Sequence, residues 1–216
     1  MSTPRSGRRA YHSPRRAQQA GATRAAILEA ARTAFTEQGY VAATIEGIAR
    51  GAAVSAETIY ATFRTKRAIL AALVDIAIAG DDAPVAILER GWVEDLRAEP
   101  DRRRRVETLA RYGRSILERR SPIDAVVAGA AAADPEMRSL LEAGLAERFA
   151  GQRELLRIVA GPDGVRPDLT LDSAADILFA IGSPEVYRLL TVVRGWSGER
   201  FEGWYAGSIE ALLTRE

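Results

Sequence analysis

The stretch that decides the fold is residues 23–74, which read TRAAILEAARTAFTEQGYVAATIEGIARGAAVSAETIYATFRTKRAILAALV. Its first apolar side chains follow the i, i+1, i+4, i+7, i+8 spacing of one helix face, at Ile27, Leu28, Ala31, Ala34 and Phe35. Thr23 can cap this helix at its start, and Gly39 suits the left-handed residue that follows a helix end. We therefore expect a helix over about residues 23–38.

Two short helices joined by a tight turn follow. Thr44 and Ser55 each provide the side-chain oxygen of a helix N-cap, and only Ala52-Ala53-Val54 separate the two predicted helices. Val54 and Ile59 are spaced for a hydrophobic staple across the second cap. Two short helices around a three-residue turn are the layout of a helix-turn-helix, whose second helix enters the major groove of DNA.

The second of these helices has a face suited to a DNA groove. With Ile59 and Phe63 turned inward, a rotation of 100° per residue points five side chains outward or sideways: Glu57, Thr58, Tyr60, Ala61 and Arg64. Thr58 and Tyr60 can bond phosphates, and the short or acidic members can contact base edges. For Tyr60, core packing is the alternative.

Charge is unevenly distributed along the chain. Residues 1–67 contain eleven basic and four acidic residues, a net charge of +7, whereas residues 68–216 carry a net charge of −6. This distribution indicates that the basic N-terminal region alone binds a polyanion such as DNA. The alternative is that the basic residues form a tail that only improves solubility. Five arginines precede Gln18, and Arg24 lies at the start of the first helix. This arm can enter a minor groove or follow the DNA backbone, or it can be an extension without a role.

The remainder of the chain predicts helices only. Apolar periodicity and breaks at Asp-Asp, Pro and Gly residues give these segments: 66–79, 83–98, 101–119, 122–133, 135–159, 171–194 (kinked at Pro184) and 198–214. No segment alternates with period two. We predict an all-α fold of about nine to ten helices, with a three-helix helix-turn-helix domain at the N-terminus and a larger helical domain at the C-terminus.

Composition and pattern also suggest the domain boundaries. Residues 1–22 are rich in Ser, Pro, Gly and Arg and contain no acidic residue, so we expect a flexible basic arm. We assign DNA binding to residues 23–68, and the predicted helix over about 66–79 links them to the rest. Ligand binding and dimerisation are assigned to residues 80–216.

The N-terminal stretch resembles the DNA-binding domain of the TetR/AcrR regulators over about fifty residues. The resemblance rests on the joint spacing of Ala30-Ala31, Phe35, Gly39-Tyr40, Thr44, Ile48-Ala49, Val54-Ser55, Thr58-Ile59-Tyr60, Phe63, Lys66 and Leu70. It implies DNA contacts from Thr44, Ser55, Ala56, Glu57, Thr58, Tyr60, Thr62 and Lys66, to which we add Arg24 at the start of the first helix. Lys66, the only lysine of the chain, is expected to hold a phosphate at a helix N-terminus, with a solvated side chain as the alternative.

Two residues depart from the family's pattern. Ala53 lies in the turn where the family often has glycine, which predicts a turn without positive φ at that point. Glu57 also replaces a frequent glycine and brings a carboxylate close to the expected phosphates. The second departure bears on which operator sequence is read and leaves the fold unchanged.

Residues 80–216 offer apolar side chains for a ligand pocket and a dimer interface. The pocket candidates lie on the central helices: Trp92, Tyr112, Ile116, Val126, Met137, Phe149 and Phe179. The small residues 128–133 can leave space beside such a pocket or allow close helix packing. The resemblance implies that the last two long helices pair with their copies, through Leu178, Ile181, Leu189, Trp204, Ile209 and Leu212. The alternative is that these apolar residues pack inside the core of the monomer.

Together these features predict a cytoplasmic, homodimeric transcriptional regulator. We expect it to bind a palindromic double-stranded DNA operator and to be released by a small apolar molecule. Two alternatives remain: the protein is an activator, or it is a DNA-binding factor that responds to a partner or acts without a ligand. We expect no enzyme activity, metal or cofactor, because the chain has no cysteine, one histidine in the N-terminal arm and no glycine-rich phosphate loop. We expect no targeting or membrane segment.

Overall fold

The computed structural model describes residues 14–83, 85–132 and 134–213, and these residues form helices and loops without any strand. The N-terminal helices are α1 (Pro14–Ala42), α2 (Ile45–Gly51), α3 (Ala56–Phe63) and α4 (Lys66–Ala79). Next come the 3-10 turn η1 (Ile87–Glu89), α5 (Gly91–Ala98), α6 (Arg102–Ala131), α7 (Pro135–Ala160) and the 3-10 turn η2 (Gly161–Asp163). The described chain ends with α8 (Leu171–Ile181), α9 (Pro184–Arg188), the π-helical turn η3 (Leu189–Val193) and α10 (Gly198–Leu213). The all-α prediction is confirmed.

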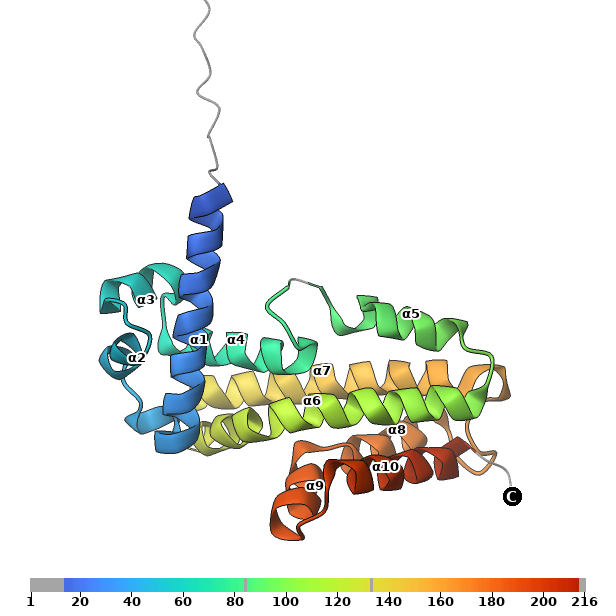
Figure 1. Ribbon diagram of the computed structural model, residues 1–216. Coiled ribbons are helices and arrows are strands. Elements are labelled where there is room, and N and C mark those ends of the chain that lie inside the picture. Colours follow the sequence, from blue (N-terminus) through green and yellow to red (C-terminus); the bar gives the residue numbers. More distant parts are fainter. Residues whose placement is uncertain (1–13, 84, 133, 214–216) are drawn as a thin grey trace, which may run out of the picture.

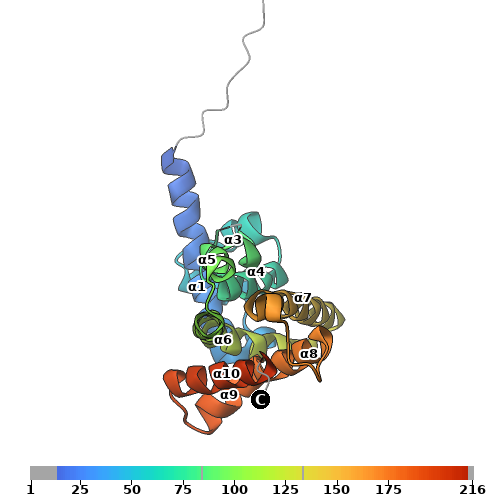
Figure 2. The same ribbon diagram turned by 90° about the vertical axis from the view of Figure 1, so that its right-hand side faces the viewer.

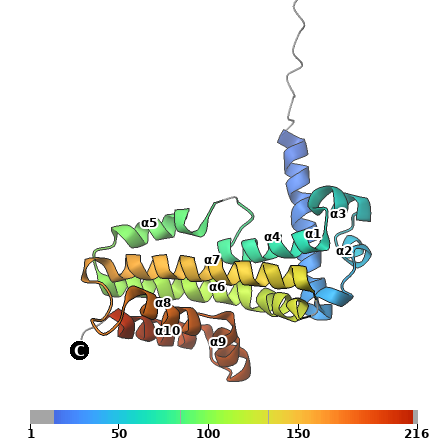
Figure 3. The same ribbon diagram turned by 180° about the vertical axis from the view of Figure 1, so that it is seen from behind.

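The helices pack in layers, with α6 and α7 side by side in the middle (Figure 1). On one side of this pair α4 contacts α6 and α5 contacts α7. On the other side α10 contacts α6 and α8 contacts α7 (Figure 2). Helices α1 to α3 are grouped at one end of the layers, where α1 crosses α6 (Figure 3).

Helix α1 is longer than the sequence pattern predicts. It begins at Pro14, so residues 14–22 are helical and not the flexible segment that we expected. Residues 17–22 read AQQAGA and are mostly good helix formers, which extend a helix that the packed residues beyond them stabilise. Residues 1–13 of the predicted arm lie outside the described residues. At its other end α1 continues to Ala42 across a kink at Gly39, whose φ of 79° favours glycine.

The turn between α2 and α3 is a Schellman motif with alanine at its left-handed position. The N–H of Val54 donates to the carbonyl of Ala49 (3.0 Å), and the N–H of Ala53 donates to the carbonyl of Arg50 (3.2 Å). Ala53 has a φ of 54°, so the expected turn without positive φ is wrong. The two hydrogen bonds, and the burial of Ile59 just after the turn, hold the backbone in this geometry, and the Cβ of Ala53 adds steric strain.

Some predicted helix breaks are not where the structure has them. Helix α6 runs through Pro122, because the fully buried Ile123 anchors the turn that follows it. The predicted segment 171–194 is divided at Ser183, whose side chain accepts a hydrogen bond from the N–H of Val186. Pro184 therefore starts a new helix and does not kink a continuous one. The segment 83–98 is helical only in η1 and α5.

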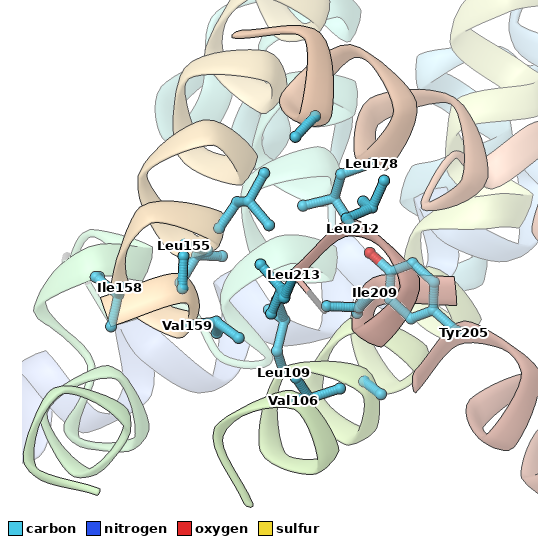
Figure 4. Close-up of a cluster of buried hydrophobic side chains, with 14 of the residues drawn as sticks. Val106, Leu109, Leu155, Ile158, Val159, Leu178, Tyr205, Ile209, Leu212 and Leu213 are labelled. Carbon is cyan, nitrogen blue, oxygen red and sulfur yellow. The ribbon is translucent and has the colours of Figure 1, made fainter. Parts of the chain in front are cut away.

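The buried apolar side chains form two clusters. One fills the space among α5, α6, α7, α8 and α10, and Figure 4 shows part of it. The other contains the inner residues of α1 to α4, such as Ile27 and Phe35, together with the adjacent ends of α6 and α7. Ile123 and Met137 are fully buried in this second cluster. The N-terminal helices thus complete their core with side chains from the central pair.

We expect Ala53→Gly to stabilise the protein. Glycine adopts a φ near 54° without the Cβ clash, and its greater freedom in the unfolded chain offsets part of that gain, so about 0.5–1 kcal/mol should remain. Chemical denaturation would measure this difference in the free energy of unfolding. The matched control is Ala52→Gly, since Ala52 has a φ of −87° and gains nothing from glycine. Equal effects of both variants would contradict the strain at Ala53.

Candidate nucleic-acid interface and ligand cavity

Each of the first three loops ends in a hydroxyl that caps the next helix. Thr44 accepts from the N–H of Gly47 (3.0 Å), and Ser55 accepts from the N–H of Thr58 (3.2 Å). Thr65 caps α4 in the same way. These hydroxyl groups fix the starts of α2, α3 and α4, and the O–H groups of Thr44 and Thr65 can still donate to a phosphate.

Helix α3 buries Ile59 and Phe63 and leaves its opposite face open to solvent. Tyr60 is half exposed, and four other expected contact residues lie at the start of α3 or on its solvent-accessible sides: Ser55, Glu57, Thr58 and Thr62. The hydroxyl groups of Thr58 and Thr62 already have neighbours, because Thr58 Oγ1 lies 3.1 Å from Ser55 Oγ and Thr62 donates to the carbonyl of Thr58. Ala56 packs against the core, and Thr44 is exposed at the start of α2.

The carboxylate of Glu57 is held in its charged form. Hydrogen bonds from its own backbone N–H and from Ser55 lower the pKa of Glu57 at the start of α3. A carboxylate at a helix N-terminus is stabilised by the helix dipole. It therefore faces the expected groove as a hydrogen-bond acceptor at neutral pH.

Arg24 connects three parts of the molecule. Its guanidinium forms two hydrogen bonds with the Asp82 carboxylate, at 2.6 and 3.0 Å, and lies 4.6 Å from the centre of the Phe63 ring. Arg24 belongs to α1, Phe63 ends α3, and Asp82 lies in the loop after α4. A groove of about 670 Å³ separates this part of α1 from α3, and Thr58 and Thr62 line its other side. Arg24, expected on DNA, is engaged within the protein.

Lys66 is also engaged within the protein. Its Nζ donates to the carbonyls of Tyr40 (2.7 Å) and Ala43 (2.8 Å), with the Val41 carbonyl at 3.5 Å. The ammonium lies 4.4 Å from the centre of the Tyr40 ring, and burial lowers the pKa of Lys66. These carbonyls occupy the three N–H bonds that the predicted phosphate contact would use. The structure therefore gives Lys66 a different role, fastening the start of α4 to the end of α1.

A cavity of about 900 Å³ opens among α4, α5, α6, α7 and the loop after α4. Of the seven predicted pocket residues, Trp92 and Ile116 line it. Tyr112 stands behind Trp92 and stacks on its ring with centroids 4.5 Å apart. The cavity also has lining residues that periodicity did not single out, among them Asp75, Arg148, Gln152 and Tyr205.

Four predicted pocket residues lie elsewhere. Val126 and Met137 are buried in the cluster that completes the N-terminal core. Phe149 and Phe179 pack edge to face, with centroids 5.7 Å apart, between α7 and α8. An apolar or aromatic residue on a central helix can face any of several neighbours, so the sequence pattern alone does not separate these positions from the cavity wall.

The end of α4 is fixed beside this cavity. Arg119 of α6 donates to the carbonyls of Ala77 (3.0 Å) and Ile78 (3.4 Å), which satisfies the free carbonyls at the end of α4. In the following loop, Arg90 binds Asp81 through two hydrogen bonds and holds the pKa of that carboxyl at about 2. The loop that borders the cavity is thus tied both to α1 and to the start of α5.

Comparison with known proteins identifies the N-terminal domain. Residues 27–73, which contain α2, α3 and most of α1 and α4, match the family model of bacterial regulatory proteins, tetR family. Over these residues the chain carries a TetR-family DNA-binding domain. This domain contains the helix-turn-helix, which supports a role in DNA-binding regulation. A search of curated proteins finds no significant match.

The fold of the whole chain is shared by solved structures. NalD, the secondary repressor of the MexAB-OprM multidrug efflux pump in Pseudomonas aeruginosa, is 20% identical, with a TM-score of 0.67 over 92% of this chain and 100% of that chain. A transcriptional regulator from Saccharomonospora viridis in complex with choline is 23% identical, with a TM-score of 0.66 over 90% and 100%. A TetR-family regulator from Syntrophomonas wolfei is 16% identical, with a TM-score of 0.68 over 87% and 93%. These likenesses establish the fold.

Part of the predicted dimer interface lies in the core of the monomer. Leu178, Ile209 and Leu212 are buried within the monomer, and Figure 4 shows them among residues of α6 and α7. They are not available to a partner, because a helix stripe does not reveal which neighbour covers it. Ile181 and Trp204 are half-buried, and Leu189 is 52% exposed. The structure adds exposed apolar side chains that the prediction missed: Ile177, Val192 and Val193.

The described residues contain neither a metal site nor a membrane-spanning helix. Within residues 14–83, 85–132 and 134–213, no group of His, Asp or Glu side chains is arranged to hold a metal ion. No helix in these ranges combines the length and apolar character needed to cross a membrane.

We expect Lys66→Met to lower the free energy of unfolding by about 1–3 kcal/mol, because the carbonyls at the end of α1 lose their charged donor. The salt dependence of DNA binding should stay unchanged. Urea denaturation and DNA titrations at several salt concentrations measure the two quantities. Arg67→Met is the control, since Arg67 forms only an exposed ion pair with Glu136. Unchanged stability with a salt slope reduced by about one would instead assign Lys66 to a phosphate.

Proposed function

We propose that this protein is a homodimeric repressor that reads a palindromic operator through α3 and is released by a small molecule bound in the 900 Å³ cavity. The observation that carries the proposal is that α4 borders both sites. Leu70 and Leu73 of α4 are buried in the N-terminal core, whereas Val74 and Asp75 line the cavity. A ligand that prefers one position of α4 therefore alters the support of α3.

The same proposal assigns operator contacts to the open face of α3. Thr58 and Tyr60 are placed to bond phosphates, and Glu57 supplies an acceptor for a base edge. Thr44, Ser55 and Thr62 add hydroxyl groups beside them, and Ala56 leaves room for close approach. The groove between α1 and α3 places residues 19–24 of α1 beside Thr58 and Thr62 of α3.

Dimerisation would use the outer side of α8, η3 and α10. Ile177, Leu189, Val192 and Val193 expose apolar side chains there, and exposed apolar patches mark protein interfaces. Ile181 and Trp204 are half-buried and can contribute their remaining surface. A twofold dimer positions two copies of α3 about one helical turn of DNA apart, roughly 34 Å.

Arg24 provides a direct connection between the cavity and the DNA-reading helix. Asp82 belongs to the cavity lining, and its carboxylate holds the Arg24 guanidinium against Phe63 at the end of α3. A ligand that moves the loop after α4 would release this contact. Two solved structures of the same fold are compatible with such a mechanism, since one is described as a repressor and another is in complex with choline.

Tyr60→Ala should weaken operator binding about tenfold, because it removes a phosphate contact without touching the core. Gel shifts with the intergenic DNA next to the gene, in the presence of competitor DNA, measure this loss. Glu142→Gln is the control, because Glu142 is exposed on α7 and far along the chain from α3. A specific shift that Tyr60→Ala leaves unchanged contradicts the assignment of α3, and a complex that forms only with added ligand contradicts release by ligand.

Arg24→Met and Asp82→Ala should each change operator affinity by about threefold, and the double variant should show no further change. The reason is that both substitutions break the same contact, so their effects are not additive. Gel shifts of the four proteins measure this cycle without any ligand. If Arg24 instead binds DNA, Arg24→Met weakens the complex whereas Asp82→Ala, which frees the guanidinium, does not.

A further inference from the structure

The charges that line the cavity are largely paired, and the pairing leaves an acidic excess. Three arginines are among the described lining residues: Arg24, Arg120 and Arg148. Arg24 binds Asp82, and Arg120 binds Asp124 with distances of 2.8 and 3.2 Å. The lining residue Asp81 is likewise bound by Arg90, which lies next to the cavity.

The third lining arginine is satisfied by the protein as well. Arg148 donates to the carbonyls of Phe179 and Gly182, both at 3.4 Å, and its guanidinium lies 3.8 Å from the centre of the Phe179 ring. Burial lowers the pKa of Arg148, and the nearby Glu185 carboxylate opposes this effect. Arg148 forms no ion pair among the described residues, and Glu185 offsets only part of its charge, but the six lining carboxylates outnumber the three lining arginines.

Two lining carboxylates have no ion-pair partner. Asp75 of α4 and Glu147 of α7 form no ion pair within the part of the chain that the structure describes. Burial and then the Glu147 carboxylate raise the pKa of Asp75, and the Arg24 guanidinium opposes this effect less strongly than Glu147 causes it. The two side chains come from different helices that line the same cavity, so a positive group between them would interact with both.

Gln152 also belongs to the lining. It donates from Nε2 to the carbonyl of Gly182 at 3.1 Å, and its buried Oε1 has no hydrogen-bond partner in the described residues. Exchange of the amide oxygen and nitrogen would set Oε1 against the Gly182 carbonyl, so the orientation is fixed. Because Oε1 has almost no accessible surface, a ligand N–H would reach it only after the Gln152 side chain moves.

The remaining wall is mainly apolar. Leu109, Leu117 and Leu155 are buried side chains of α6 and α7 that face the cavity, and Trp92 covers it from α5. We propose that the cavity binds an organic cation, with its apolar body against these side chains and its protonated amine or ammonium group between Asp75 and Glu147. This inference rests on the proposed role of the cavity as the effector site and names the chemical class of the effector.

The test uses two ions of equal shape and opposite charge, tetraphenylphosphonium and tetraphenylborate. Equilibrium dialysis against the full-length protein should find the cation bound at least tenfold more tightly than the anion. In Asp75→Asn/Glu147→Gln the preference should fall to near unity, mainly through weaker binding of the cation. The control Glu142→Gln removes one carboxylate of α7 outside the cavity and should keep the preference.

Each contrary outcome is informative. Equal binding of the two ions, tighter binding of the anion, no binding of either, or a preference that survives in the double variant overturns the inference. If Glu142→Gln also loses the preference for the cation over the anion, the preference arises from the acidic surface as a whole, and the inference is overturned too. Gel shifts without either ion test the regulator separately. Operator binding without cation binding refutes only the effector class, and cation binding without operator binding refutes the proposed repressor while leaving the cavity inference standing.

Discussion

The structure depends on the fact that the N-terminal helices cannot close a hydrophobic core by themselves. Helices α2 and α3 are only seven and eight residues long, so the apolar faces around Ile27 and Phe35 need a further surface. The ends of α6 and α7 supply it with Ile123 and Met137. Because a close-packed core transmits displacement, the recognition helix and the central helices respond to one another.

Helix α4 occupies the point where this shared core meets the cavity. A single basic side chain fastens it at each end, with Lys66 on the carbonyls that end α1 and Arg119 on the carbonyls that end α4. Its inner face belongs to the N-terminal core and another face to the cavity wall. In the proposed mechanism this helix acts as the lever, and the Arg24–Asp82 contact connects the loop after it to α3.

The turn between α2 and α3 keeps its left-handed conformation although the residue at that position is alanine and not glycine. Two backbone hydrogen bonds and the flanking buried residues impose the left-handed conformation, although Ala53 lacks the freedom of glycine. Reasoning from the residue type predicted a different turn, because propensity is a local term and the packing of two helices outweighs about 1–2 kcal/mol of strain. The same kind of override lets α6 continue through Pro122.

The sequence by itself determined the helical class, the helix-turn-helix, and the inward and outward faces of α3. These depend on local terms, namely 3.6-residue periodicity, capping hydroxyl groups and the burial of Ile59 and Phe63. Only the tertiary structure decided which apolar stripes face core, cavity or partner, as Met137, Trp92 and Leu189 illustrate. It also decided that Lys66 and Arg24 bind the protein itself. Periodicity reports that a face is covered, but the covering neighbour is set by contacts between residues far apart in the chain.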